Sequence, residues 1–221
     1  IFFKDKLTNI INMKKYSIEF LGTFFLLLIS GLADNPIAIG VGLAVLCYIG
    51  GHISGAHYNP AVSIAMVIRG EINKVECSKY IISQVLGAIA ASFIYFLITN
   101  NIFEIQPSSD TTRVQFLISE FIFTFLLVLT ILFVATHPKL KGNQFYGAVI
   151  GLCVMTSQYS IGEISSSALN PAISIGPALF NIFNGEGSNM SLAFSPYYVV
   201  ITIISGIFAA YLFKFYLKEN N

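Results

Sequence analysis

The tripeptide Asn-Pro-Ala occurs twice in this chain, as Asn59-Pro60-Ala61 and as Asn170-Pro171-Ala172. Each copy opens an apolar stretch of about ten residues, which polar and charged residues end at 69–71 and 184–187. A helix of that length is about 15 Å long, roughly half the thickness of the hydrocarbon core of a bilayer. Each stretch could therefore reach the middle of a membrane but could not cross it.

The composition places the chain in a membrane. Of its 221 residues, 55% are hydrophobic and 10% are charged, and the mean hydropathy is +0.75. A soluble domain of this size needs more charged surface than these residues supply. The net charge of +1 and the lack of a basic block argue against nucleic-acid binding. Cys47, Cys77 and Cys153 stand alone in or beside apolar runs, which favours packing over a disulfide or metal role.

Six apolar windows are long enough to span a bilayer, which requires about 20 residues. The window from Met13 resembles a signal peptide, but its length, its internal Glu19 and the five windows after it favour a retained span. We expect a cytoplasmic N-terminal segment over 1–15 and one domain over 16–217, with repeat one at about 16–100 and repeat two at about 113–217. The windows lie at about 16–33, 37–54, 79–98, 114–135, 145–161 and 196–216.

Positive charge is divided unevenly between the two sides of a six-span arrangement. Of the 12 Lys and Arg residues, only Arg113 falls on the side opposite the termini. The positive-inside rule therefore predicts that both termini are cytoplasmic. We expect an integral protein of the cell membrane, meaning the plasma or inner membrane.

The two halves of the chain resemble each other beyond the tripeptide, which indicates an internal duplication. EFLGTFFLLL from Glu19 is echoed by EFIFTFLLVL from Glu120, and GAIAA from Gly87 by GIFAA from Gly206. Three spans per repeat is an odd number, so the second repeat should lie upside down relative to the first. The two short helices would then enter from opposite faces and meet, each with Asn as its N-cap and Pro in its first turn.

The loops SGAHYNPAVS and LNPAISIGPA resemble the two signature loops of the aquaporin, or major intrinsic protein, family, and the resemblance extends from about Tyr16 to Phe213. It implies an all-α membrane protein with six transmembrane helices and two re-entrant half-helices. It also implies a passive channel in the lipid bilayer for water, excluding protons and ions, with no cofactor or metal. Members of the family usually form homotetramers.

The resemblance also assigns roles to particular residues. The amides of Asn59 and Asn170 would donate hydrogen bonds into a narrow pore. Glu19 and Glu120 would hold the backbone of the re-entrant loops, although Glu19 is also near enough to a span end to reach the membrane surface. Backbone carbonyls would line the pore as acceptors at Gly55, Ala56, His57, Ser166, Ser167 and Ala168.

A selectivity ring is expected at Ile39, Gln158, Ser167 and Ile173. Most relatives carry Arg at the position of Ile173, where it narrows the pore and repels cations. Without that Arg the ring should be wider and less polar than in a strict water channel. A facilitator of glycerol, urea, ammonia or undissociated metalloid acids is therefore an alternative function. Other markers resemble the water-selective branch, namely Ser174, Ala178 and the pair Tyr197-Tyr198.

Two further functional classes fit the sequence less well. A secondary transporter can be built from inverted repeats, but it needs a coupling-ion site, and Glu163 lies seven residues before Asn170 in an outer loop. An enzyme would need a nucleophile with a base, a metal cluster or a phosphate loop, none of which the sequence pattern offers. We therefore expect no enzymatic activity.

Overall fold

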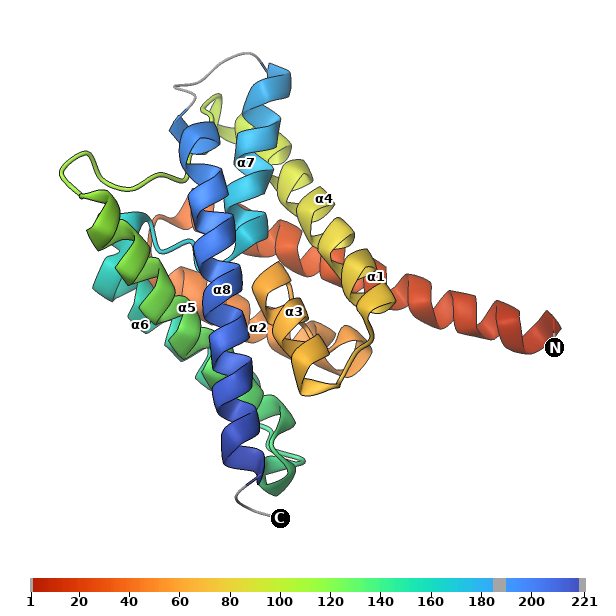
Figure 1. The fold of residues 1–221 in the computed structure, drawn as a ribbon. Helices are drawn as coiled ribbons and strands as arrows, with labels where there is room; N and C mark the ends of the chain where they lie inside the picture. Colours follow the sequence, from red (N-terminus) through yellow and green to blue (C-terminus); the bar gives the residue numbers. More distant parts are fainter. Residues whose placement is uncertain (1, 185–189, 219–221) are drawn as a thin grey trace.

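The structure, a computed structural model, describes the backbone of residues 2–184 and 190–218 and the side chains of 13–184 and 190–217. These residues form eight α-helices and one short 3-10 helix, which confirms the all-α prediction (Figure 1). The elements are α1 (Phe2–Ala33), α2 (Pro36–Ser54), α3 (Pro60–Arg69), α4 (Lys74–Thr99), α5 (Arg113–Thr136), η1 (Pro138–Leu140), α6 (Tyr146–Ser165), α7 (Pro171–Asn184) and α8 (Met190–Lys218).

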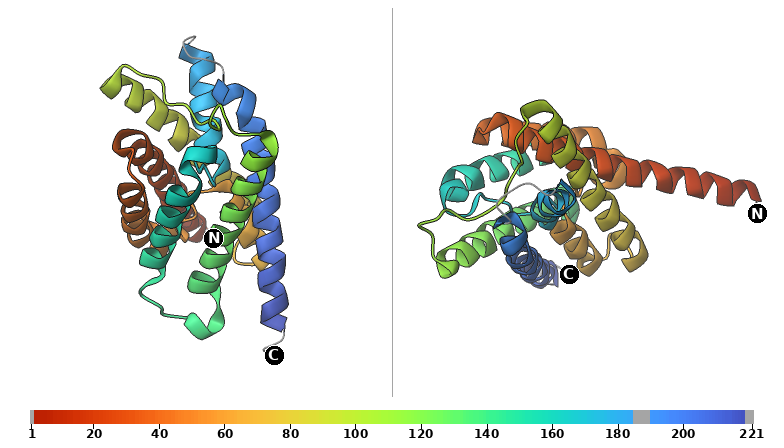
Figure 2. Two further views of the ribbon diagram at one scale, coloured as in Figure 1. Left: turned by 90° about the vertical axis from the view of Figure 1, so that its left-hand side faces the viewer. Right: turned by 90° about the horizontal axis from the view of Figure 1, so that it is seen from above.

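Six of the helices are long, and five of these are apolar enough throughout to cross a membrane: α1, α2, α4, α5 and α8. The sixth, α6, has 20 residues but carries polar side chains along one face, including Gln158 and Glu163. The backbone of α1 continues without a break from Phe2 to Ala33, so no break marks the predicted boundary after residue 15. Its first turns project away from the other helices (Figure 2).

The two short helices differ in length. α3 has 10 residues, as the sequence predicts, whereas α7 has 14 and includes Pro177. The estimate of about ten residues is therefore wrong for α7, because that helix continues to Asn184 at the start of the polar segment. At about 1.5 Å per residue α7 is still shorter than the bilayer core.

The helices are paired as an inverted repeat requires. α1 packs on α4 in the first repeat and α5 packs on α8 in the second, while α2 and α6 join the two repeats. Each short helix packs against the last long helix of the other repeat, α3 on α8 and α7 on α4. In Figure 1, α7 and α3 extend in opposite directions from a shared level in the bundle, and they contact each other there.

Equivalent contacts correct the repeat register near the ends of the two halves. Tyr80 donates to the carbonyl of Ser54 at 2.9 Å, and Tyr198 donates to the carbonyl of Ser165 at 2.6 Å. This pairing makes Ser205, rather than Gly206, the counterpart of Gly87. Gly87 faces the carbonyl of Phe20, and Ser205 donates to the carbonyl of Phe121 at 2.6 Å. The sequence match of the two GxxAA segments is therefore wrong by one residue.

The crossing of α2 and α6 depends on two facing glycines. A Cβ atom on Gly151 would lie 2.3 Å from the carbonyl oxygen of Gly40, and one on Gly40 would lie 2.6 Å from the carbonyl oxygen of Gly151. Both obstacles are backbone atoms, which cannot move aside without separating the helices. This close approach brings the two halves of the protein together.

We expect Gly151→Ala to destabilise the protein by about 1–3 kcal/mol, because overpacking at a backbone contact forces α2 and α6 apart. Thermal unfolding of the detergent-purified protein, followed by circular dichroism, measures the effect. Gly162→Ala on the same helix is the matched control, because its Cβ would meet only the Gln158 side chain, at 3.7 Å. Equal unfolding temperatures for the two variants would contradict this reading of the crossing.

Candidate functional site

The loops that precede α3 and α7 share an unusual backbone conformation. Gly55 ends α2 with φ +90°, and Ser166 ends α6 with φ +59°. Ala56 and Tyr58 also have positive φ, and so do their repeat equivalents Ser167 and Leu169. Non-glycine residues seldom adopt this left-handed region, and such strain persists only where the surrounding structure holds it.

Glu19 holds the first of these loops from the middle of α1. Its side chain is fully buried, and its Oε1 accepts from the backbone N–H of His57 at 3.0 Å and from the Ser54 hydroxyl at 2.5 Å. Its Oε2 accepts from the N–H of Tyr58 at 2.7 Å and from Nε2 of Gln84 at 2.8 Å. The carboxylate therefore lies in the protein interior and does not reach the membrane surface.

Glu120 holds the second loop in the same way. It is fully buried, and it accepts from the backbone N–H groups of Ala168 at 3.0 Å and Leu169 at 2.9 Å. The hydroxyl of Ser165 donates to it at 2.6 Å. Ser165 thus has an acidic partner that its sequence neighbours do not reveal, and the contact supports the loop backbone.

The two tripeptides are linked across the centre of the bundle. Nδ2 of Asn59 donates to the carbonyl of Leu169 at 2.9 Å, and Nδ2 of Asn170 donates to the carbonyl of Tyr58 at 2.9 Å. Each Oδ1 meanwhile accepts from the second N–H of its own helix, that of Ala61 or Ala172, at 2.9 Å. An amide nitrogen carries two hydrogens, so one hydrogen of each Asn is left for another acceptor.

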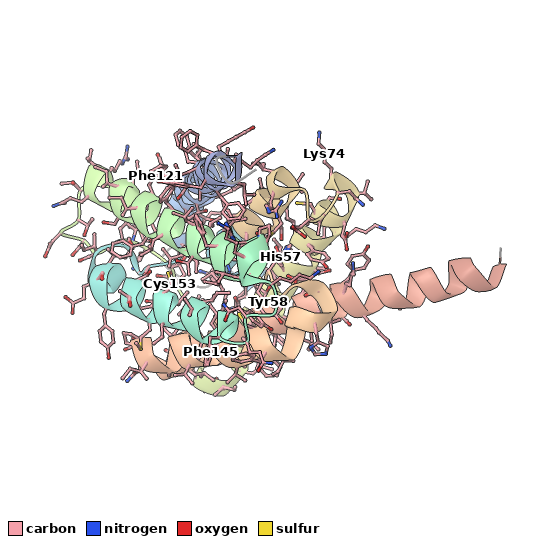
Figure 3. The ribbon with its side chains drawn as sticks, turned by 90° about the horizontal axis from the view of Figure 1, so that it is seen from below. His57, Tyr58, Lys74, Phe121, Phe145 and Cys153 are labelled. Carbon is pink, nitrogen blue, oxygen red and sulfur yellow. The ribbon has the colours of Figure 1, made fainter. Side chains whose placement is uncertain are left out.

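A second buried network joins the first loop to α4. Nδ1 of His57 lies 3.1 Å from the Ser63 hydroxyl, which accepts from Nε2 of Gln84 at 3.0 Å. Sequence reasoning missed Ser63 and Gln84. A fully buried amide within an apolar span was the available signal, because such residues are rarely placed there without a role. In Figure 3, His57 and Tyr58 lie toward the middle of the helices, whereas Lys74 lies at their edge.

One continuous cavity of about 740 Å³ runs beside both Asn residues. Its walls include Asn59 and Asn170 together with all four residues of the predicted ring. The predicted carbonyl positions at Ala56, His57, Ser166, Ser167 and Ala168 also line it. Other predicted residues are not among the lining residues, namely Gly55, Pro60, Ala61, Pro171 and Ala172. These shape the loop and start the short helices.

Two aliphatic and two polar residues make up the predicted ring. Ile39 and Ile173 are almost fully buried in the bundle. Nε2 of Gln158 donates to the backbone carbonyl of Ser167 at 3.0 Å. That contact fixes the orientation of the amide and uses one of the carbonyls predicted to face the pore.

Three carboxylates line one end of the cavity: Asp34, Glu104 and Glu163, which we call the acidic mouth. Glu104 belongs to the connection between α4 and α5, which hydrogen bonds hold in place. The hydroxyl of Ser166 donates to the carbonyl of Gln106 at 2.6 Å, and the N–H of Ser108 donates to the carbonyl of Ile164 at 3.1 Å. The acidic mouth was not predicted, because its residues come from three separate connections.

The inverted bundle, the paired half-helices and the cavity between them define a class of protein: a membrane channel for water or small neutral solutes. Residues 6–213 match the family model described as Major intrinsic protein. The chain belongs to this family, and it is an integral membrane channel rather than an enzyme.

Relatives from distant organisms support the assignment. Aquaporin AqpM of Methanothermobacter thermautotrophicus is 32% identical, with 93% of this chain and 98% of the relative covered. Nodulin-26 of Glycine max is 31% identical, with 95% and 80% covered. Among solved structures, the X-ray structure of the aquaglyceroporin from Plasmodium falciparum superposes with a TM-score of 0.80 at 21% identity, covering 91% of this chain and 95% of that one.

Proposed function

We propose that this protein conducts water passively through the cavity and excludes protons and ions at the level of Asn59 and Asn170. The observation that carries the proposal is the crossed pair of amides at the facing starts of α3 and α7. Each helix start carries about half a positive charge, so the pair opposes any cation at that level. A water molecule that accepts from both amides must point its own hydrogens away, which interrupts a proton-conducting chain.

A second candidate function is the passage of small neutral solutes such as glycerol or urea. The observation that favours it is Ile173, because an aliphatic side chain lines the cavity where most relatives place Arg. Among the described residues that line the cavity, none is Lys or Arg. Nothing cationic then narrows the ring, and a solute wider than water meets a lower barrier.

We further propose that both termini face the cytoplasm and that four copies assemble around a common axis, one pore in each. Charge supports the orientation. Lys15 pairs with Glu76 at 2.7 Å where α1 and α4 meet, and Arg69 donates to the carbonyl of Thr136 at 3.1 Å. Arg113 lies at the start of α5, which is the opposite end of that helix. Native mass spectrometry measures the number of copies.

Purified protein in liposomes tests the conduction proposal. Vesicle shrinkage is followed by stopped-flow light scattering under sucrose, glycerol and urea gradients. Water permeability above that of empty liposomes supports the channel, and additional glycerol or urea permeability supports the second candidate. If none of the three exceeds the empty vesicles, the proposed function is wrong.

We expect Ile173→Arg to lower glycerol or urea permeability about tenfold more than water permeability, which corresponds to roughly 1.4 kcal/mol on the solute barrier. The long guanidinium side chain would narrow the ring and leave a path only for the smaller molecule. The same vesicle assay measures both permeabilities. Ile173→Leu is the control, because it keeps the volume and the apolar character. Equal losses for water and solute in the Arg variant would contradict a role of Ile173 in selection by size.

A further inference from the structure

The charge on the cavity wall is confined to one end and has one sign. Asp34, Glu104 and Glu163 line the acidic mouth, and the described lining residues include no Lys or Arg to balance them. Arg113 does not line the cavity, and its guanidinium lies 5.8 Å from the centroid of the Tyr197 ring. A cleft lined by charges of one sign raises the local concentration of ions of the opposite sign. The acidic mouth should therefore attract cations.

The ring beside the mouth offers acceptors in place of donors. The hydroxyl of Ser167 is buried and has no hydrogen-bond partner among the described residues, and Ser167 is only 2% exposed. Nε2 of Gln158 is held by the Ser167 carbonyl, so the acceptor Oε1 is the other polar atom of that amide. A buried hydroxyl without a partner is costly and indicates that a ligand or water completes it.

The acidic mouth is close enough to the ring for both to act on one ion. Glu163 follows Gln158 by five residues near the end of α6, a rise of about 7.5 Å. Asp34 precedes Ile39 by the same number of residues at the start of α2. Such distances are near the Debye length of about 8 Å at physiological salt, so the carboxylates are only partly screened at the ring.

We propose that the space between the acidic mouth and the ring is a binding site for a small organic cation with several N–H donors, of which guanidinium is the best fit. The carboxylates attract the ion, and the Ser167 hydroxyl and Gln158 Oε1 accept its hydrogens. A planar guanidinium group would take the place that an Arg side chain takes in most relatives. The positive starts of α3 and α7 oppose further movement, so the bound cation plugs the pore.

The chemistry of the lining favours an organic cation over a metal ion. Within the part of the chain that the structure describes, no three His, Cys, Asp or Glu side chains are grouped closely enough to hold a metal. A flat ion with hydrogens along its edge can instead use separated acceptors. The proposal that the ion blocks flow rests on the proposed function, whereas the binding site itself does not.

The first test measures water permeability of liposomes with millimolar guanidinium chloride on both sides, against equal sodium chloride. We expect permeability to fall about threefold and the block to weaken as ionic strength rises. The triple variant Asp34→Asn, Glu104→Gln and Glu163→Gln should raise the guanidinium concentration needed for half-block at least about tenfold. Asp110→Asn is the matched control, because Asp110 is exposed and does not line the cavity.

The second test measures binding of radiolabelled guanidinium to the detergent-purified protein by equilibrium dialysis, which needs no flow. Binding that the triple variant weakens and Asp110→Asn retains supports the site. Equal binding to the wild type and the triple variant, or no binding to either, overturns it. Liposomes that conduct no water would refute the proposed function and leave the dialysis result to decide the site.

Discussion

Replacing Glu19 with leucine is expected to lower the free energy of unfolding by on the order of 4 kcal/mol and to abolish most water conduction. The change removes the acceptor of four buried donors: two loop N–H groups, the Ser54 hydroxyl and the Gln84 amide. Each buried donor without a partner costs about 1–3 kcal/mol. Leucine has a similar volume, so little room opens for water to replace the carboxylate.

The Glu120→Leu variant should fail in the same way but by less, because that carboxylate serves three donors instead of four. Removing a buried charge also removes its desolvation cost, yet the abandoned donors stay buried, so the net effect remains destabilising. Thermal unfolding in detergent and water permeability in liposomes measure the two consequences.

Thr124→Val is the matched control for both glutamate variants. Thr124 is fully buried on the same helix as Glu120, and its hydroxyl has no partner among the described residues. Its replacement by an apolar residue of similar shape should leave stability unchanged or slightly raised. If Glu19→Leu unfolds at the same temperature as Thr124→Val, the carboxylate does not hold the loop.

Replacing Asn170 with aspartate is expected to raise proton and cation permeability at least about tenfold while water still passes. The carboxylate keeps an acceptor for the N–H of Ala172, so the start of α7 is preserved. It loses the donor to the carbonyl of Tyr58, and its negative charge offsets the combined positive charge of about one at the two helix starts. The barrier to cations at the centre of the pore therefore falls.

Vesicles loaded with a pH-sensitive dye measure proton flux, and light scattering on the same preparation measures water. Asn73→Asp is the matched control, because Asn73 also caps a helix, accepting from the N–H of Glu76 at 2.9 Å, but is exposed at the start of α4. Unchanged proton flux in Asn170→Asp, with normal water permeability, would show that cations are excluded somewhere other than the tripeptides.

Several parts of the site could be predicted because they depend on neighbours in sequence. The Asn-Pro pairs predicted both helix starts, since an Asn side chain caps its own next turn and Pro suits the first turn. The spacing from each tripeptide predicted ring positions that all line one cavity. The length of α7 was underestimated, because no sequence signal marks where a polar segment stops being helical.

The sequence by itself determined the membrane class, the duplicated plan and the two half-helices, because hydropathy and capping act over a few residues. Only the tertiary structure decided what meets at the centre and at the mouth. The amide of Asn59 bonds to a carbonyl 110 residues away, and Gln84 reaches Glu19 across 65 residues. The acidic mouth likewise brings together three separate connections. Such contacts follow from how helices of opposite repeats pack, and no local pattern carries that information.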